Sequence, residues 1–557
     1  MKKTLLSIFG VAACLAGFAQ QTPSPSWTIT QNSNFPIPSA GIRYMDAVNS
    51  NVVWATGYDG TTGNTSRAYC WVTKTTDGGN TWNASPVWPS TVTPVIGDTS
   101  TYVISSLEGQ SATTAWVAAY KKINGGSQGG IFKTTNGGST WVNMTSAAMF
   151  TNAASFCNWV TFLTPNIGVC DGDPNSSTGN EHELWRSTDG GTTWSPVAGA
   201  NIPNPVSGEY ALTNIYEKFG STHLWFGTNK GRIYRSTDAG VTWNVTTVNA
   251  SNSISDISFY DANNGVTVTF PASGTVATVY STTDGGVTWT ANNAGNDPNF
   301  GRNDVCAIPG TCWFASAGAG AGNNIISFSM DGGASWSSWG STNIQYLTID
   351  FVDPSTGWAG TFSDQANAAL EGFYKYNGGS LLQPASANFS LVSAACVSTG
   401  ISLGNSSTGN PCPTFTWTSF PPTAAFSSST ALTPTVTFNS AGTYTIILTA
   451  SNSVTTSIVT RTVSVSTCAG LNSQSANNID FMVSPNPSKD VFNVSLPYAV
   501  TPYNVTVTNV LGSVVYTDKV VVTSGNYAVN LANNKTGVYF MTVENNGVKS
   551  TKKIIIE

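Results

Sequence analysis

A short motif recurs along the first two thirds of the chain, and it constrains the fold more than any other feature. Six segments read TTDGGNTW, TTNGGSTW, STDGGTTW, STDAGVTW, TTDGGVTW and SMDGGASW. They lie roughly 50 residues apart, a period typical of propellers and solenoids. We call each segment a clip. The acidic or amide residue of the clips is Asp77, Asn136, Asp189, Asp238, Asp284 or Asp331, and the tryptophan is Trp82, Trp141, Trp194, Trp243, Trp289 or Trp336.

The residue types of the clip predict a hairpin turn. An Asp or Asn side chain accepts hydrogen bonds from backbone N–H groups two residues further on, and glycine supplies the positive φ of a tight turn. The tryptophan then begins the next strand and buries a large apolar area. A carboxylate used in this way is unavailable for acid–base chemistry, so we assign the clips a structural role and no catalytic one.

A second repeat precedes each clip. Stretches such as SDISFYDANNGVTVTF alternate apolar and other residues on both sides of a turn, which indicates two antiparallel strands. The strands before and after the clip bring each unit to four, the content of a propeller blade. Seven units are marked by Trp54, Trp116, Val169, Trp225, Val266, Trp313 and Trp358. We therefore predict a seven-bladed β-propeller over residues 20–380.

The seventh unit lacks a complete clip, because Asn377 is not followed by a tryptophan. The segment SPSWTITQ near the N-terminus resembles a strand that follows a clip. We predict that Trp27–Gln31 supplies the outer strand of the last blade. This pairing would close the ring and remove exposed sheet edges.

The N-terminus has the features of a secretion signal. Lys2 and Lys3 precede an apolar stretch that is too short to span a bilayer, and a small-residue cleavage site predicts residues 1–19 as a signal peptide. A second interpretation is lipoprotein processing at Cys14. No later segment is long and apolar enough to be transmembrane. A net charge of −6 without long basic runs argues against nucleic acid as a partner, and we expect a monomer.

The cysteine count favours disulfides. Removing Cys14 from the nine cysteines leaves an even number in an exported chain. Cys157 and Cys170 flank one short turn and Cys306 and Cys312 flank another, so each pair is placed to staple a hairpin. No cysteine spacing suggests zinc, and we predict no metal site from them. The pairing stays open for Cys70, Cys396, Cys412 and Cys468.

The clip resembles the Asp box of bacterial neuraminidase (BNR) repeats. The whole unit is most similar to the photosystem II assembly factor and sortilin-like propellers, over about residues 26–380. The resemblance implies the propeller fold. It implies no single function, because these propellers include enzymes, receptors and assembly factors.

Two small β-sandwich domains are predicted after the propeller, so the chain is all-β. Residues 383–468 contain NSAGTYTIILTASN, which resembles PKD domains; TSFPP replaces the acidic loop of that family, so we expect a spacer. Residues 480–557 resemble the type IX secretion C-terminal sorting domain. This resemblance implies handling by the type IX secretion machinery, export through the periplasm, and a secreted or surface-attached product. It is carried by Pro485, Asn486, Pro487, Gly512, Gly537, Tyr539, Lys552 and Lys553.

Few residues are available for catalysis. His182 and His223 are the only histidines, and the arginine-bearing start motif of sialidases is missing. A glycoside hydrolase needs two carboxylates. Asp46, Asp261 and Asp353 recur at one repeat position, so we interpret them as turn residues.

The blade geometry predicts where a ligand binds. The clips occupy turns at one end of the ring, so the middle turns and the links between blades face the other end, where we expect the binding surface. DGDPNSSTGNEHELW is one of three long, irregular middle turns. The oxygen atoms of Asp171, Asp173, Asn175 and Glu181 would suit calcium, although their spacing matches no defined calcium loop, and no other cofactor is expected. The candidate binding residues are Asp59, Arg67, Asp171, Asp173, Glu181, His182 and Asp364.

Two functions stay open at this point. The first is an exported, noncatalytic surface protein that binds or scaffolds, with a glycan or a protein as its ligand. The alternative is an extracellular glycoside hydrolase that acts on polysaccharide through loop carboxylates.

Overall fold

The computed structural model of the chain is built almost entirely of β-strands, as the repeats predict. It describes residues 27–31, 33–37, 40–60, 70–87, 102–121, 129–152, 154–176, 179–271, 277–292, 297–320, 323–341, 344–361, 372–467, 479–496, 501–521 and 526–557. The predicted signal peptide with Cys14, and also Arg67, Asp364 and Cys468, lie outside the described residues.

Residues 27–376 form seven antiparallel four-stranded sheets in the described part of the chain, and each sheet corresponds to one unit of the sequence repeat. The first sheet contains β2 (Ala40–Ala47), β3 (Val53–Asp59), β4 (Trp71–Thr75) and β5 (Asn83–Pro86). The second contains β6 (Tyr102–Gly109), β7 (Ala115–Lys121), β8 (Gly129–Thr134) and β9 (Val142–Asn143). The third contains β10 (Cys157–Phe162), β11 (Gly168–Gly172), β12 (Trp185–Ser187) and β13 (Ser195–Pro196).

The other four sheets repeat this order. The fourth contains β14 (Ala211–Phe219), β15 (His223–Thr228), β16 (Arg232–Ser236) and β17 (Asn244–Thr247), and the short helix η2 (Gly199–Asn201) precedes it. The fifth contains β18 (Asn252–Phe259), β19 (Gly265–Pro271), β20 (Thr278–Thr282) and β21 (Thr290–Asn292). The sixth contains β22 (Asp304–Ala307), β23 (Phe314–Gly318), β24 (Ile325–Ser329) and β25 (Ser337–Ser341). The seventh contains β26 (Tyr346–Asp353), β27 (Thr356–Thr361), β28 (Phe373–Tyr376) and β1 (Trp27–Gln31).

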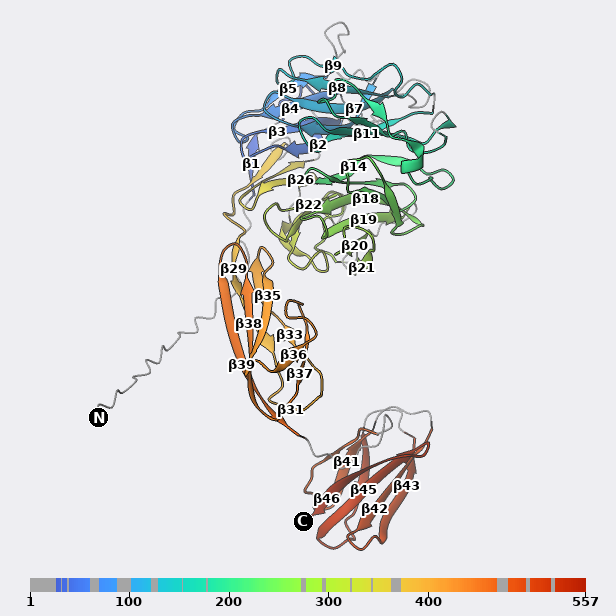
Figure 1. Cartoon of the computed structure of the whole chain (residues 1–557), viewed down its shortest axis with the longest axis vertical. Helices are drawn as coiled ribbons and strands as arrows, with labels where there is room; N and C mark the ends of the chain where they lie inside the picture. Colours follow the sequence, from blue (N-terminus) through green and yellow to red (C-terminus); the bar gives the residue numbers. More distant parts are fainter. Residues whose placement is uncertain are drawn as a thin grey trace, which may run out of the picture. The chain divides into compact units, whose positions relative to one another are not determined.

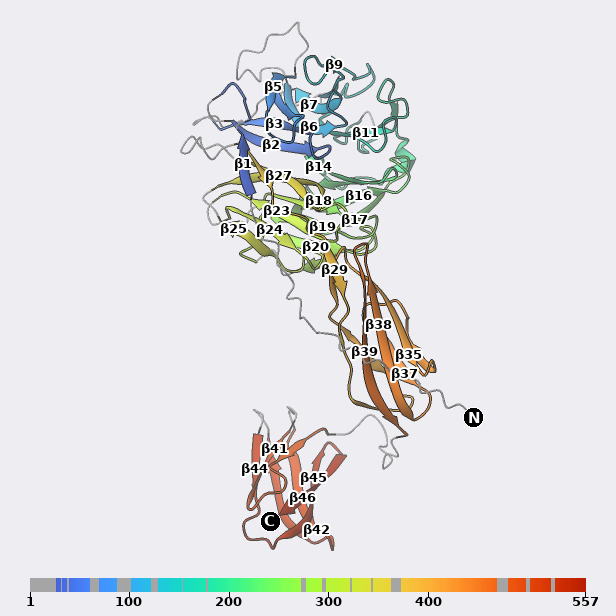
Figure 2. The same cartoon turned by 90° about the vertical axis from the view of Figure 1, so that its left-hand side faces the viewer.

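The seven blades form a closed ring. The innermost strands contact one another in the order β2, β6, β10, β14, β18, β22 and β26, and β26 also contacts β2. Strand β1 pairs antiparallel with β28, with Trp27 opposite Tyr376, and is therefore the outer strand of the seventh blade (Figures 1 and 2). The prediction that the N-terminal strand completes the last sheet is confirmed.

The clip turns are held by a recurring set of side-chain hydrogen bonds. In the first clip, the Asp77 carboxylate accepts the backbone N–H of Thr81 at 2.8 Å and its hydroxyl at 2.6 Å. The sequence predicts that the N–H two residues after Asp77, that of Gly79, donates to the Asp77 carboxylate. This prediction is wrong, because that N–H donates to the hydroxyl of Thr75 at 2.9 Å. The hydrogen bonds from Thr81 lower the pKa of Asp77 to about 2, so this carboxylate stays ionised and engaged in its turn.

Each clip also packs against a marker residue of the preceding blade, which explains why a large apolar residue recurs at that position. Gly191 of the third clip has a φ of +80°, and a Cβ placed there would lie 2.2 Å from the ring of Trp116 in the second blade. Lys133 donates to a carbonyl of the same clip at 3.0 Å and lies over the Trp116 ring. Gly79 of the first clip meets Trp358 of the seventh blade in the same manner, so the contact also joins the last blade to the first.

A β-sandwich follows the seventh blade, with Trp417 and Tyr444 in its core. One sheet has the order β31-β39-β38-β35 and another has β32-β37-β36. The propeller and nearly all of this sandwich form one compact unit, and the C-terminal domain belongs to another. The strands are β29 (Gln383–Ser386), β30 (Phe389–Ser390), β31 (Ala394–Cys396), β32 (Ile401–Ser402), β33 (Gly404–Asn405), β34 (Thr408–Asn410), β35 (Thr414–Phe420), β36 (Ala424–Phe426), β37 (Thr435–Phe438), β38 (Gly442–Ser451) and β39 (Thr456–Ser466).

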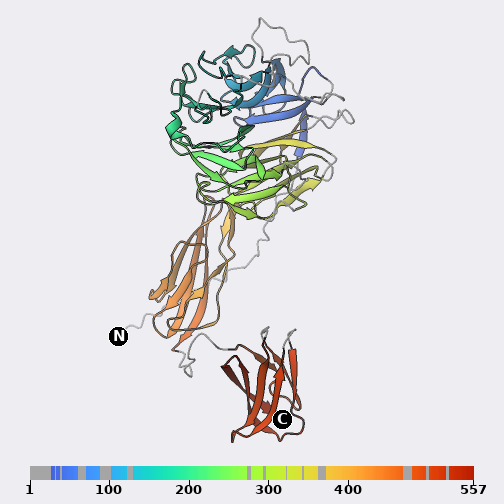
Figure 3. The same ribbon diagram turned by 90° about the vertical axis from the view of Figure 1, so that its right-hand side faces the viewer.

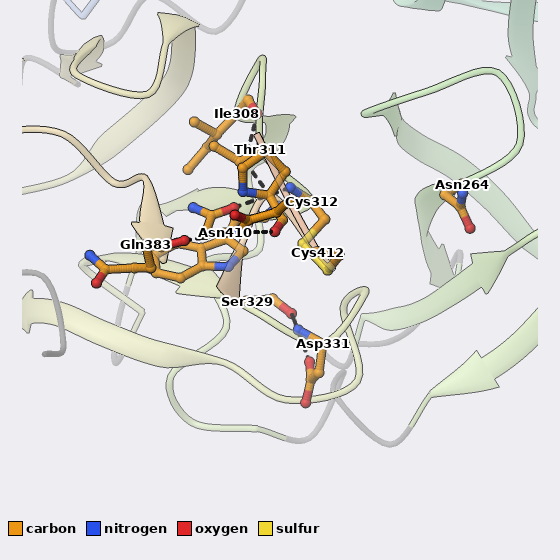
Figure 4. Close-up of a disulfide and its surroundings, with 12 residues drawn as sticks. Asn264, Ile308, Thr311, Cys312, Ser329, Asp331, Gln383, Asn410 and Cys412 are labelled. Carbon is orange, nitrogen blue, oxygen red and sulfur yellow. Dashed lines mark hydrogen bonds between the residues drawn. A yellow bond between two sulfur atoms is a disulfide. The ribbon is translucent and has the colours of Figure 1, made fainter. Parts of the chain in front are cut away.

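A disulfide between Cys312 and Cys412 joins the sixth blade to the sandwich (Figure 4). Beside it, the Asn410 amide donates to the carbonyl of Leu381 at 2.7 Å and accepts the N–H of Cys312 at 3.4 Å. The disulfide expected between Cys306 and Cys312 is therefore wrong, and Cys306 is a free thiol that lines the central channel of the ring.

The other hairpin disulfide is also wrong, because Cys157 and Cys170 are both buried free thiols. They lie on the paired strands β10 and β11, but Cys157 is opposite Gly172 whereas Cys170 is opposite Val160. The two cysteines therefore do not face each other directly across the hairpin. Among the cysteines for which the sequence predicts no pairing, Cys70 is a buried thiol that donates to the carbonyl of Tyr102, and Cys396 is disulfide-bonded.

The C-terminal domain is a second β-sandwich, drawn in red in Figure 3. Its sheets have the orders β40-β41-β44 and β43-β42-β45-β46. The Asn486 side chain donates to the carbonyl of Lys553 and accepts the N–H of Ile555, both at 2.9 Å, so the Pro-Asn-Pro turn is tied to the last strand. The strands are β40 (Met482–Ser484), β41 (Val491–Ser495), β42 (Tyr503–Asn509), β43 (Val514–Val520), β44 (Asn526–Asn530), β45 (Gly537–Asn545) and β46 (Val548–Ile556).

Candidate functional site

The middle turn of the third blade, between β11 and β12, brings together most of the polar residues singled out in the sequence. Asp171 and His182 are 0% and 1% exposed, and the Asp171 carboxylate lies 3.2 Å from the Nδ1 of His182. The other oxygen of Asp171 shares the amide donor of Asn158 with Asp173, at 3.0 and 2.8 Å. The His182 ring packs edge-on against Phe226 of the fourth blade. Asp171 and His182 thus stabilise the base of the loop and are covered by protein.

Burial governs the ionisation of these carboxyls. It raises the pKa of Asp171 and raises that of Asp173 to about 7. Asp173 is half-buried, so of the two it is the one that solvent reaches.

A third carboxylate, Glu183, fastens the loop to the link that precedes the third blade. One of its oxygens accepts the N–H of Phe150 at 2.7 Å and the indole N–H of Trp185 at 3.2 Å. The other accepts the hydroxyl of Ser155 and the amide of Asn175. Phe150 has a φ of +54°, which is rare for a bulky residue and marks local strain that these bonds hold in place.

The fastened loop and link enclose a cavity of about 270 Å³, which we call the outer cavity. Its apolar wall includes Leu184, Trp185 and Ile202, and its polar groups include Asn152 and Glu181. Glu181 is half-buried and sits at the loop surface, unlike its neighbours His182 and Glu183. The outer cavity is therefore amphipathic and has a partly exposed carboxylate at its edge.

A second cavity of about 400 Å³, the inner cavity, lies between the same loop and the link to the fourth blade. Gly179 and Asn180 line it on the loop side, and residues 204–209 line it on the link side. The buried Glu209 accepts the N–H of Val206 and the hydroxyl of Thr228, each at 2.7 Å, and pairs with Arg232. Sequence reasoning misses this link, because it carries only one charged residue and no motif.

The remaining predicted residues lie elsewhere. Asp59 is buried at the end of β3 in the first blade, and His223 begins β15, where it stacks on Trp225. In the described residues, no group of three His, Cys, Asp or Glu side chains is arranged to hold a metal ion. Asn175, one of the oxygen donors considered for calcium, uses its amide to hold Glu183.

Acidic residues that the sequence does not mark as a group line the central channel. Asp46, expected in a turn, lies in strand β2, and its carboxylate accepts the N–H of Gly109 in the next blade at 2.6 Å. Equivalent bonds link later innermost strands. The other channel carboxyls are Glu108, Glu217, Asp256, Asp304 and Asp350.

The channel carboxyls are poorly solvated. Burial raises the pKa of Asp46 to about 7 and that of Glu217 to about 8. Lys218 faces the same channel and pairs with Glu108. These bonds between blades give the channel carboxyls a structural role. The signal that could have found them is an acidic residue in the first strand of most units.

Two family models match parts of the chain. The model described as sortilin, neurotensin receptor 3, matches residues 182–300, and the secretion system C-terminal sorting domain matches residues 482–557. No curated protein matches the chain. Within the described residues, no helix is long and apolar enough to cross a membrane.

Solved propeller structures resemble the chain at low identity. YCF48 from Cyanidioschyzon merolae is 17% identical with a TM-score of 0.41, and the match covers 62% of this chain and 97% of YCF48. The Hadza microbial sialidase Hz136 is 14% identical with a TM-score of 0.35, covering 61% and 65% of the two chains. The GH74 xyloglucanase from Xanthomonas campestris is 12% identical with a TM-score of 0.26, covering 74% and 66%.

The family matches agree with the repeats and with the fold at both ends of the chain. The sorting domain coincides with the C-terminal sandwich, and the sortilin match falls within the blades. The two family matches and the ring of four-stranded sheets together show an exported protein, secreted or displayed on the cell surface, that combines a BNR-type β-propeller with a type IX secretion C-terminal sorting domain.

Proposed function

We propose that this protein is a noncatalytic glycan-binding protein and that its ligand occupies the outer cavity beside the third-blade loop. One observation carries the proposal. The described lining of the cavity combines the apolar side chains of Leu184, Trp185 and Ile202 with the polar side chains of Asn152 and Glu181.

The lining suits a sugar ring. A sugar has an apolar face of C–H groups and an edge of hydroxyls, and the cavity lining includes the apolar side chains of Trp185 and Ile202 as well as the carboxylate of Glu181 and the amide of Asn152. Its volume of about 270 Å³ is in the range of a single sugar unit with its water. The bonds of Glu183 and the strained Phe150 fix the walls in advance, which reduces the entropy lost on binding.

The same lining argues against glycoside hydrolysis. That reaction needs an acid and a second carboxylate on opposite sides of the scissile bond. Asp171 and Asp173 share one amide donor, and neither is among the described residues that line the outer cavity. Glu183, which does line it, already accepts four hydrogen bonds within the protein. One observation supports the hydrolase as second candidate: the pKa of Asp173, raised by burial to about 7, is in the range of a general acid.

Glycan-array screening of the full chain, followed by calorimetry and assays of reducing-sugar release, tests the proposal. We expect binding without release. The substitution Glu181→Gln should weaken binding about fivefold, because it replaces a charge-assisted hydrogen bond with a neutral one. Asp353→Asn, at the end of β26 beside the turn to β27, is the matched control and should leave binding unchanged.

Two results would contradict the proposal of noncatalytic glycan binding. Release of reducing sugar that is lost in Asp173→Asn would establish the hydrolase instead. Binding of a protein ligand, with no glycan bound, would show that the cavity serves a different class of partner.

A further inference from the structure

We infer that a second site, on the link side of the inner cavity, binds the acidic group of an anionic sugar, a carboxylate or a sulfate, through the ammonium of Lys230. The site goes beyond the proposed function, because it lies outside the outer cavity and assigns a separate chemistry to charged glycans.

The ammonium of Lys230 lies at the rim of the inner cavity. Lys230 belongs to the middle turn of the fourth blade, between β15 and β16, at the end of the ring where the sequence predicts the binding surface. Gly208 lines the cavity, and a Cβ placed on it would lie 3.9 Å from the Lys230 Nζ. With a volume of about 400 Å³, the cavity has room for a sugar unit beside this cation.

Lys230 has no structural bond to maintain through its side chain. The propeller lysines that donate to a carbonyl of a neighbouring clip are Lys74, Lys133 and Lys375. Lys230 is half-buried, and its ammonium takes part in no ion pair or hydrogen bond among the described residues. Its charge is therefore available to a ligand, for which a charge-assisted hydrogen bond is the strongest single contact that a lysine offers.

The carboxylates closest to the link do not offset this charge. Glu209 is buried, pairs with Arg232 and also accepts the N–H of Val206 at 2.7 Å. Asp173 precedes Pro174 of the cavity lining, and burial raises its pKa to about 7, so it is only about half ionised at neutral pH.

Glu181 determines how an anionic sugar would be oriented. Its carboxylate lies on the loop side of the inner cavity, where a Cβ placed on Gly179 would be 2.7 Å from one of its oxygens. Like charges repel, so the acidic group of the sugar is directed to the link side, where Lys230 lies. The neutral part of the sugar then faces the loop.

The link is tied to the turn that carries Lys230. The Asn229 side chain donates to the carbonyl of Gly208 at 3.0 Å and accepts the N–H of Tyr210 at 2.9 Å. The N–H of Asn229 donates to the carbonyl of Tyr210 at 3.1 Å. These bonds hold Gly208 and the turn in register before a ligand arrives, which reduces the entropy lost on binding. Asn204 and Ser207, both exposed, add an amide and a hydroxyl to the same side of the cavity.

Calorimetry on the full chain tests the site with four probes: hexagalacturonate for the carboxylate, a κ-carrageenan hexasaccharide for the sulfate, neutral cellohexaose, and sodium sulfate as a simple anion. Lys230→Met removes the charge but keeps the length of the side chain, and Lys230→Arg restores the charge. Lys519→Met removes an exposed charge of the C-terminal domain and is the matched control. Glu181→Gln perturbs the outer cavity. Thermal unfolding of each variant checks that the propeller is intact.

We expect at least one of the two acidic hexasaccharides to bind, and the one that binds identifies the acidic group. Lys230→Met should weaken it at least about tenfold, whereas Lys230→Arg should stay within about threefold of the unmodified chain. Lys519→Met and Glu181→Gln should not weaken it. Added salt should weaken the binding, because it screens a partly exposed charge.

Three results would overturn the site: no binding of either acidic hexasaccharide, equal binding by Lys230→Met, or sodium sulfate bound as tightly as the sugars, which would mean an adventitious ion only. An acidic glycan lost in Glu181→Gln and kept in Lys230→Met would overturn it as well, while leaving glycan binding at the outer cavity in place. Conversely, an acidic glycan that depends on Lys230, with no glycan that depends on Glu181, would overturn the proposed use of the outer cavity and support this second site.

Discussion

The closure of the ring by β1 gives a quantitative prediction for Trp27→Ala. The Trp27 ring contacts those of Tyr376, Phe351 and Trp339, at centroid distances of 5.5, 5.8 and 6.1 Å. Truncating a fully buried aromatic residue costs about 3–5 kcal/mol, and Trp27 is half-buried, so we expect a loss of about 2 kcal/mol. A loss of this size raises the population of the opened blade about 30-fold.

Hydrogen exchange measured by mass spectrometry reads this population directly, because the β28 amides that bond β1 exchange when the strand opens. We expect their exchange to accelerate about 30-fold in Trp27→Ala. Ile29→Ala is the control, because Ile29 lies in the same strand but is 41% exposed, and it should accelerate exchange little. Unchanged protection of β28 in Trp27→Ala would refute the idea that this strand closes the seventh blade.

Three further predictions concern the ring and its attachment. Burial raises the pKa of Glu217 to about 8 in the folded chain. The contribution of Glu217 to stability is therefore complete below its ordinary pKa of 4.5 and is lost as the pH rises through 8. The melting temperature of the propeller should fall from pH 5 to pH 9, and it should fall less steeply in Glu217→Gln. Replacing Cys312 and Cys412 together by serine opens a loop of 100 residues and should cost up to about 4 kcal/mol, seen as faster proteolysis between blade and sandwich; unchanged proteolysis would contradict the disulfide. Gly332→Ala, at a φ of +70° with open space around it, should lower the free energy of unfolding in urea by about 1 kcal/mol. Gly191→Ala should lower it by at least about 2 kcal/mol more, because the new Cβ meets Trp116. Equal losses would show that the contact between blades contributes little to stability.

The propeller was predictable because its information is local. Each clip specifies its own turn within eight residues, and the tryptophan that follows marks the next strand. The pairing of Trp27 with Tyr376 spans the whole propeller, yet it too followed from the sequence, because the seventh unit visibly lacks one strand and the N-terminal segment resembles it.

The features that failed depend on contacts between distant segments. Cys312 pairs with Cys412 in another domain, whereas the nearer Cys306 lines the channel. The sequence predicts a turn for Asp46, because only ring closure reveals that the first strand of each blade faces a common axis. The loop sequence suggests that Asp171 and His182 face solvent, but polar residues near a strand end are as readily buried when they hydrogen-bond one another.

The pairing of β1 with β28 constrains the order in which the propeller folds during synthesis. The segment that contains Trp27 is made early, but its partner near Tyr376 emerges only after all the other blades. Until then the early strand has no sheet to join, and when the last blade forms, its outer edge is bare for as long as the two ends take to meet. Closing the seventh blade therefore requires the two ends of the propeller segment to find each other. A chaperone that shields bare sheet edges would act on this protein at that step.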